Sequence, residues 1–254
     1  MKRLITVICI VGIAASGVAD ASALRKTRPH GMARQSGGIV EKAYKGKVIR
    51  VINTVNEPYL SKLDAIVLKI RRSAQLPVEL SCGEIPNGLL PFSYAKDAAG
   101  YGNTGATVVI IENKSLPIIL SSPDEKWAIL NLATLKGESD RLETRLSKAL
   151  WATIARAIGA GSTGDAGCVL APFSNVKELD SIVASEPSPI AHNALIDVAR
   201  MSGINVIYFA TYRTACQQGW APAPNNDVQR TIWQEVHTIP DKPMTIEFDP
   251  KKDK

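Results

Sequence analysis

The sequence has little histidine and no intact catalytic motif. Its 254 residues include three histidines, His30, His192 and His237, and no two of them have the spacing of metal ligands. It also has no G-x-S-x-G elbow, P-loop, Rossmann glycine run or EF-hand loop. These absences exclude the common nucleophile, phosphate and metal sites, so each histidine is best interpreted as an isolated surface residue.

Long hydrophobic runs are also lacking. The apolar run at residues 4–13 is too short to span a bilayer, and no later stretch is long enough. It follows a basic start at residues 1–3 and precedes an A-x-A sequence at residues 21–23, with residues 17–19 as a second candidate cleavage site. We therefore predict a signal peptide over residues 1–23, no membrane span, and export to the periplasm or the extracellular space.

The charge of the chain does not indicate a nucleic-acid partner. Thirty basic residues against 24 acidic residues give a net charge of +6, and the excess is concentrated in residues 24–47. No aromatic interleaving or nucleic-acid motif accompanies these charges. We predict a flexible basic arm over residues 24–46 that is solvated or touches an anionic surface, and no nucleic-acid binding.

Cysteine is scarce after the predicted cleavage. Cys82, Cys168 and Cys216 remain, an odd number that permits one disulfide and one free thiol in an exported protein. Three pairings are possible and the sequence does not choose among them. A disulfide would stabilise the protein by about 2–4 kcal/mol.

Hydrophobic periodicity predicts an α/β (α+β) domain over residues 47–212. The expected strands cover residues 47–53, 77–80, 106–113, 115–121, 126–132 and 205–210. The expected helices cover residues 57–74, 138–158, 176–184 and 190–201. Residues 83–105 are typical of an irregular connection. Residues 213–254 form a Pro-rich extension that we expect to pack on the domain, with Trp220 and Trp233 as anchors.

The longest helical pattern ends in residues 152–162, ATIARAIGAGS. With Gly159 on its glycine, this segment has the spacing of the zinc-binding sequence H-E-x-x-H-x-x-G-x-x-H. The three histidine positions are Ala152, Arg156 and Ser162, and the Glu position is Thr153. Alanine and arginine are not zinc ligands, and a lone hydroxyl is a very poor one. We therefore expect no zinc cofactor and no catalytic residue here, although the segment is also compatible with a plain Ala-rich helix end.

Residues 47–200 resemble the archaemetzincin family, whose motif is H-E-x-x-H-x-x-G-x-x-x-C-x4-C-x-M-x17-C-x-x-C. The run WAILNLATLKGESDRLETRLSKAL is similar to the family's strand, linker and entry into the active helix, and CVL followed by PFSN is similar to its cysteine, methionine and Phe-Ser-Asn run. The resemblance implies a zincin-like core, in which a mixed twisted sheet packs against helices.

The resemblance also implies that a second, structural zinc site is degenerate. Its four cysteine positions are Thr163, Cys168, Ser188 and Ala191, so Cys168 alone is retained. Cys168 is also compatible with a role as a disulfide partner, which the oxidising compartment favours, and His192 is near enough in sequence to approach this site. The methionine below the catalytic metal is replaced by Leu170, a volume-conserving change.

The resemblance implies an inactive peptidase homologue, a pseudoprotease, that binds a peptide or protein in its former active-site cleft. The apolar stripe of the long helix leaves Ala152 and Arg156 on another face, so both are expected to line the cleft or to face solvent. The Arg156 guanidinium would occupy the emptied metal pocket and bind a carboxylate of the protein or of a ligand. The alternatives are a hydrolase that uses other residues and a structural cell-envelope protein that assembles through its tail. The oligomeric state is left open.

Overall fold

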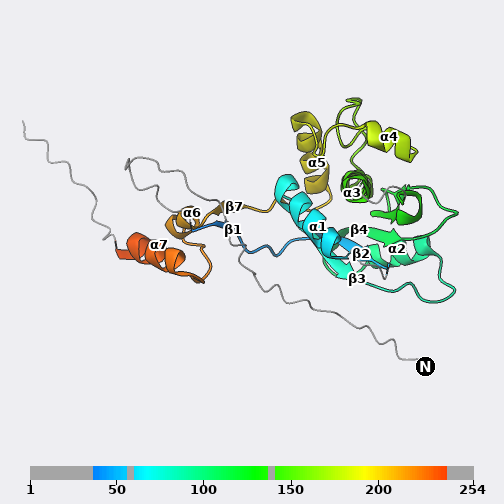
Figure 1. The fold of residues 1–254 in the computed structure, drawn as a ribbon. Helices are drawn as coiled ribbons and strands as arrows, with labels where there is room; N and C mark the ends of the chain where they lie inside the picture. Colours follow the sequence, from blue (N-terminus) through cyan, green and yellow to red (C-terminus); the bar gives the residue numbers. More distant parts are fainter. Residues whose placement is uncertain (1–36, 56–59, 137–140, 239–254) are drawn as a thin grey trace, which may run out of the picture. The chain divides into compact units, whose positions relative to one another are not determined.

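The computed structural model describes residues 37–55, 60–136 and 141–238 and divides the chain into two compact units (Figure 1). The first unit comprises Tyr44–Ile207. The described residues of the second unit are 37–43 and 208–238. The predicted signal peptide lies outside the described residues. Among the described helices, none combines the length and the apolar character that crossing a membrane requires.

The first unit contains a five-stranded mixed sheet in the order β3-β2-β4-β6-β5. Its parallel strands are β2 (Val48–Asn53), β3 (Val78–Cys82), β4 (Thr104–Ile111) and β6 (Trp127–Asn131). The edge strand β5 (Ile119–Ser122) runs antiparallel to β6. The predicted α/β class and mixed sheet are confirmed.

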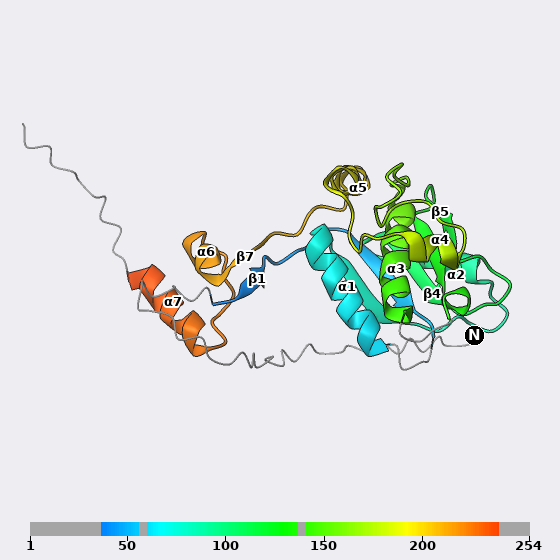
Figure 2. The same cartoon turned by 45° about the horizontal axis from the view of Figure 1, so that its top comes forward.

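Helices cover both faces of this sheet, because its strands are apolar on both. In β4, Val108 and Ile110 belong to one core cluster, whereas Val109 and Ile111 belong to another. Helices α1 (Leu60–Ala74) and α3 (Leu142–Ile158) cover the first face, and α2 (Pro91–Ala99) covers the second (Figures 1 and 2). The remaining helical elements of this unit are η1 (Leu132–Thr134), α4 (Val176–Ser181) and α5 (Pro189–Met201).

Residues 83–105 were predicted to form an irregular connection. This prediction was wrong, because the segment contains helix α2. Pro91 occupies the first turn of the helix, where the missing N–H costs nothing. Tyr94, Ala95, Ala98 and Ala99 then form a narrow face that packs against the sheet. The face is short and mostly alanine, which explains why its periodicity is weak.

Helix α3 is the central helix of the unit, and its leucine and isoleucine stripe is buried after the half-buried Leu142 at its start. Leu146, Leu150, Ile154 and Ile158 are each at most 3% exposed. The helix ends at Gly159, whose φ of 91° lies in the left-handed region and whose N–H bonds to the Arg156 carbonyl. Lys126 Nζ donates a hydrogen bond of 3.0 Å to the Ile158 carbonyl, which satisfies an oxygen that the helix leaves unpaired.

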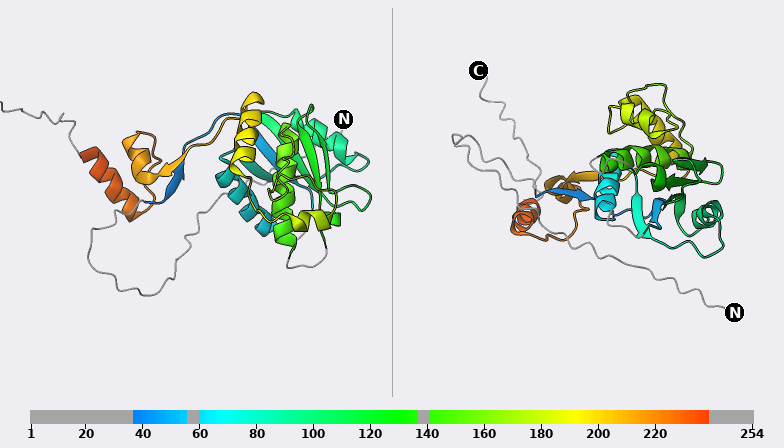
Figure 3. Two further views of the ribbon diagram at one scale, coloured as in Figure 1. Left: turned by 90° about the horizontal axis from the view of Figure 1, so that it is seen from above. Right: turned by 45° about the vertical axis from the view of Figure 1, so that its right-hand side comes forward.

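The second unit joins the two ends of the described chain (Figure 3). Strand β1 (Ile39–Glu41) pairs antiparallel with β7 (Phe209–Thr211). Helices α6 (Tyr212–Gln217) and α7 (Asp227–Thr238) pack around a small core of Tyr212, Cys216 and Ile232.

This unit differs from the sequence expectation in three ways. Residues 39–41 of the expected flexible arm form a strand, because β7 supplies a partner distant in sequence. The strand expected at residues 205–210 is β7, at Phe209–Thr211, and the first unit ends at Ile207 rather than at residue 212. The Pro-rich extension contains a helix, α7, and most of a second, α6.

The two tryptophans of the extension make contacts within their own unit. The Trp220 ring meets the Tyr208 ring edge-on, with centroids 5.6 Å apart, and Lys42 Nζ lies 6.0 Å from the Trp220 ring centroid. Trp233 stacks on His237 with centroids 4.2 Å apart. Trp233 also packs against the core of the unit, so both tryptophans contribute to the packing of the second unit.

The disulfide that the sequence permitted is not formed among the described cysteines. Cys82 is an exposed free thiol, and Cys168 and Cys216 are buried free thiols. Burial raises the pKa of the Cys216 thiol, which disfavours its reactive thiolate.

Candidate functional site

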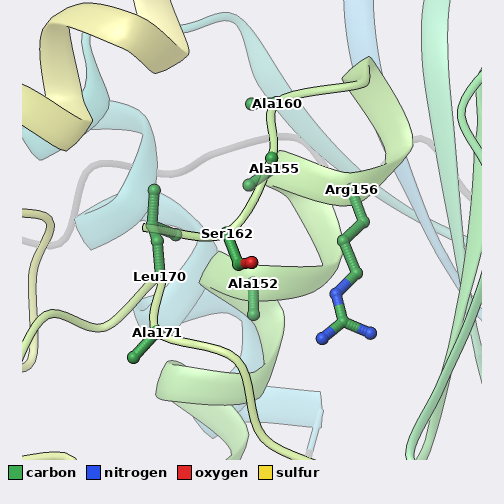
Figure 4. Close-up of a pocket in the computed structure, with 8 residues that line it drawn as sticks. Ala152, Ala155, Arg156, Ala160, Ser162, Leu170 and Ala171 are labelled. Atoms are coloured by element: carbon green, nitrogen blue, oxygen red, sulfur yellow. The ribbon is translucent and has the colours of Figure 1, made fainter. Parts of the chain in front are cut away.

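A small pocket, the helix-end pocket, is formed by the last turns of α3 and the chain that follows it (Figure 4). The residues that line it are Ala152, Ala155, Arg156, Ala160, Gly161, Ser162, Leu170 and Ala171. Its enclosed space is about 10 Å3, about what one ordered water molecule occupies. All three predicted histidine positions and the predicted methionine position therefore lie at one pocket.

The backbone around Gly159 brings these positions together. Because Gly159 turns the chain back, Ala160 N donates to the Ala155 carbonyl at 2.8 Å, and the next residues run past the helix end. Thr163 N then donates to the Leu170 carbonyl at 3.1 Å, and this hydrogen bond holds the two sides of the returning loop together. Figure 4 shows Ser162 and Leu170 on this loop, facing the helix turn that carries Ala152.

Thr153, at the predicted general-base position, does not line the pocket. Its side chain is fully buried, and its Oγ1 donates a hydrogen bond of 2.6 Å to the Ala149 carbonyl one turn earlier in α3. The hydroxyl is therefore committed to the helix backbone. It is not positioned to activate water in the pocket.

Arg156 is the single charged residue that lines the pocket, and its side chain is half-buried. Its guanidinium carbon lies 5.8 Å from the Phe173 ring centroid, a cation–π distance. Burial lowers the pKa of the guanidinium, yet an arginine stays protonated in proteins. In Figure 4 the side chain extends past Ala152, away from Leu170.

The four positions of the predicted structural zinc site are used for local hydrogen bonds. Cys168 Sγ accepts from Ser188 N at 3.3 Å and from Leu170 N at 3.5 Å, so Cys168 and Ser188 do lie together. Ser188 Oγ accepts from Ala191 N at 3.4 Å and caps α5. Thr163 Oγ1 accepts from Asp165 N at 3.2 Å. A single sulfur among hydroxyl and methyl groups does not make a zinc site.

The sequence predicted three isolated surface histidines, and His192 differs from that prediction because its Nε2 is buried. His30 lies outside the described residues. His237 Nδ1 is 2.8 Å from the Trp233 carbonyl in the second unit. His192 follows Ala191 on α5, and its Nε2 is buried without a hydrogen-bond partner in the described part of the chain. Within that same part, no three His, Cys, Asp or Glu side chains form a group that could hold a metal.

Strand β5 presents an open edge in the same unit. Asn131 N donates to the Ile118 carbonyl at 2.8 Å, so the antiparallel ladder directs the backbone groups of Leu120 and Ser122 toward β6. By the same alternation, the N–H and C=O of Ile119 and Ser121 point to the outer edge. Across the described ranges no strand lies beyond β5.

This edge adjoins the helix that carries the pocket. Helix α3 packs against β5. The turn after β5 reaches the end of α3, where a Cβ at Gly159 would lie 3.6 Å from Pro123 Cβ. Sequence reasoning missed the two outward-facing residues of β5, because the backbone groups left at the free edge depend on how β5 pairs with β6, which is a tertiary contact.

Comparison with known proteins gives a structural likeness and no sequence match. No protein-family model matches the chain, and no curated protein sequence matches it. Its structure is similar to that of the archaemetzincin from Methanopyrus kandleri, with a TM-score of 0.50 and 15% identity, over 61% of this chain and 96% of that chain. The chain has an archaemetzincin-like fold.

Two further solved structures are similar over a comparable share of the chain. A zinc-dependent peptidase from Methanocorpusculum labreanum has 14% identity and a TM-score of 0.46, and covers 58% of this chain and 99% of its own. The archaemetzincin from Archaeoglobus fulgidus, solved with malonate, has 14% identity and a TM-score of 0.43, with the same coverage.

The zinc that this fold implies does not fit the residues present. At the three predicted histidine positions the pocket offers a methyl group from Ala152, a hydroxyl group from Ser162 and the guanidinium of Arg156. A guanidinium cation has no lone pair to donate and would repel Zn²⁺. The donor set of the helix-end pocket is therefore unsuited to the metal.

Proposed function

We propose that this chain is an exported, catalytically inactive peptidase homologue that binds a peptide or protein segment in extended form. The segment adds to the open edge of β5 and passes the helix-end pocket. The observation that carries the proposal is that Ala152, Arg156 and Ser162 meet at one pocket of an archaemetzincin-like fold. None of the three is a zinc ligand, so the chemistry that needs a metal-bound water has no support here.

Peptide binding at a sheet edge requires no metal. An extended peptide beside β5 would pair with the outward N–H and C=O groups of Ile119 and Ser121, as in strand addition generally. All four residues of β5 are partly exposed, so its edge is accessible. The backbone provides affinity in this mode, and the neighbouring pocket provides selectivity.

A peptide-binding measurement tests the proposal. The probe is an acetylated peptide of alternating valine and threonine with one central glutamate, an amidated C-terminus and a neutral dye, here named the Glu peptide. We expect saturable binding by fluorescence anisotropy, and we expect loss of binding when alternate peptide nitrogens are methylated, since methylation removes the donors that a strand needs. Equal binding of both forms would contradict strand addition.

A variant of β5 provides the complementary control. Ser121→Pro removes an outward N–H without touching the ladder to β6, so we expect a folded protein with at least tenfold weaker binding of the Glu peptide. Ser121→Ala keeps the N–H and should bind as the parent protein does. Zinc-dependent cleavage of any peptide by the parent protein would refute the inactive state, and chelator-resistant cleavage would favour a hydrolase that uses other residues.

Introducing histidines at the predicted ligand positions tests whether these positions correspond to those of a zinc site. The triple variant Ala152→His, Arg156→His, Ser162→His, here named the reverted chain, should bind about one zinc ion by the geometry of H-E-x-x-H proteins. Thr153 is left unchanged because its position is buried. A reverted chain that is folded and binds no zinc would mean that these positions do not correspond to metal ligands. Export is tested separately, by N-terminal sequencing for cleavage after residue 23 or after residue 19.

A further inference from the structure

The helix-end pocket holds a cation without an anion. Its lining contains no acidic residue. Among the residues that the structure describes, the Arg156 guanidinium makes no ion pair or hydrogen bond, and its one assigned contact is the face of Phe173. A half-buried charge without a counter-ion is unfavourable, because burial removes water that nothing in the pocket replaces.

The three carboxylates that follow Arg156 along the chain up to the end of α4 are committed to other partners. Asp165 Oδ1 accepts from Gly167 N at 3.0 Å. Both oxygens of Glu178 accept hydrogen bonds from the residues that begin α4, and these bonds hold the pKa of Glu178 below its usual range. Asp180 is bound by the two nitrogens of Arg145 at 2.8 and 2.7 Å. Each acid of this segment therefore has its own donors.

The groups beside Arg156 are suited to a small anion. The Ser162 side chain is exposed and can donate its hydroxyl, and a Cβ at Gly161 would meet no atom within 4 Å, so there is open space above the loop. The contact with Phe173 orients the guanidinium plane, which reduces the entropy lost when its fork of N–H groups engages a carboxylate.

We infer that the open side of the helix-end pocket is a carboxylate-binding site and that Arg156 is the residue that binds the carboxylate. The inference rests on the proposed function for its occupant. In the bound peptide, the carboxylate is either an acidic side chain or the C-terminus, and Arg156 anchors it while the backbone adds to β5. The archaemetzincin-like pocket thereby selects among peptides by charge.

Three peptides separate the sources of the carboxylate. The first is the Glu peptide, the second replaces its glutamate with glutamine, and the third is the glutamine peptide with a free C-terminus. We expect the amidated glutamine peptide to bind about tenfold or more weakly than the best carboxylate peptide, because a charge-assisted hydrogen bond is lost. Tight binding of the Glu peptide would identify an acidic side chain as the carboxylate, and tight binding of the glutamine peptide with a free C-terminus would identify the C-terminal carboxylate.

Variants assign the effect to one residue. Arg156→Gln should remove the difference between the peptides, and Arg156→Lys should retain part of it, since lysine keeps the charge and loses the fork. Arg200→Gln, which removes an equal charge from an exposed position on α5, should preserve the difference. Binding of the Glu and amidated glutamine peptides with equal affinity would overturn the inference and leave the proposed strand addition intact.

A second measurement on the unaltered protein stands apart from peptide binding. Titration with acetate should shift the NMR signal of the Arg156 side-chain N–H saturably, and titration with acetamide should not. A response to acetate without binding of any peptide would support the carboxylate site and refute the proposed function. Identical responses to acetate and acetamide would overturn the carboxylate site.

Discussion

Replacing Gly159 with alanine tests how the helix-end pocket is built. Gly159 has a φ of 91°, and an added Cβ would lie 3.6 Å from Pro123 and 3.7 Å from Lys126 Nζ, which are ordinary contacts. The cost is therefore backbone strain of about 1–2 kcal/mol without a steric clash. The lower entropy of the unfolded alanine chain offsets about 0.4–1 kcal/mol of it. We expect a net destabilisation of about 1 kcal/mol.

The assay is urea unfolding of the first unit, followed by the fluorescence of Trp127 and Trp151. Replacing Trp220 and Trp233 with phenylalanine in both parent and variant removes the signal of the second unit. Gly161→Ala is the matched control: Gly161 has no left-handed φ, and its added Cβ would meet open space, so its effect should lie within about 0.5 kcal/mol of zero. Equal effects of the two substitutions would refute the assigned role of Gly159.

Further expectations concern the surroundings of the pocket. Asp180→Ala should destabilise the first unit by about 2–3 kcal/mol, because it leaves the buried Arg145 without its bidentate partner. Arg145 lowers the pKa of Asp180 in the folded protein. The stability that the Arg145–Asp180 pair contributes is therefore fully present above the unfolded pKa of about 3.9 and is lost as the pH falls through the folded pKa. Acidification should accordingly destabilise the parent protein more than the Asp180→Ala variant. Leu170→Met should cost less than about 1.5 kcal/mol, whereas Leu170→Ala should cost about 2–5 kcal/mol, both by urea unfolding. A Leu170→Met variant as unstable as Leu170→Ala would mean that Leu170 is not packed as described.

The sequence predicts the main sheet and its long helix well, because both have strong periodicity. The recurrence of apolar residues at every fourth position predicted helix α3, and Gly159 predicted where this helix ends. The spacing of the zinc-binding sequence also selected Ala152, Arg156 and Ser162, and in the structure these three residues line one pocket. It expected Ala152 and Arg156 to face a cleft or solvent. Ala152 lines the pocket but is only 4% exposed.

The second unit could not be predicted from local patterns. Strand β1 has three residues and pairs with β7 near the other end of the chain, so neither strand has a strong pattern of its own. Helix α7 follows a Pro-rich run, and its anchor Ile232 packs on Tyr212 and Cys216, which precede that run. Pairings of this kind are set by tertiary contacts and not by local composition.

Zinc content is the most direct test of the central proposal, that this chain with an archaemetzincin-like fold does not use zinc. The measurement is zinc per protein molecule by elemental mass spectrometry, on untagged protein purified without chelators. We expect a value near zero, and a value near one for the reverted chain measured in parallel. A value near one for the parent protein would contradict the proposal, because it would require a metal site built from residues other than Ala152, Arg156 and Ser162.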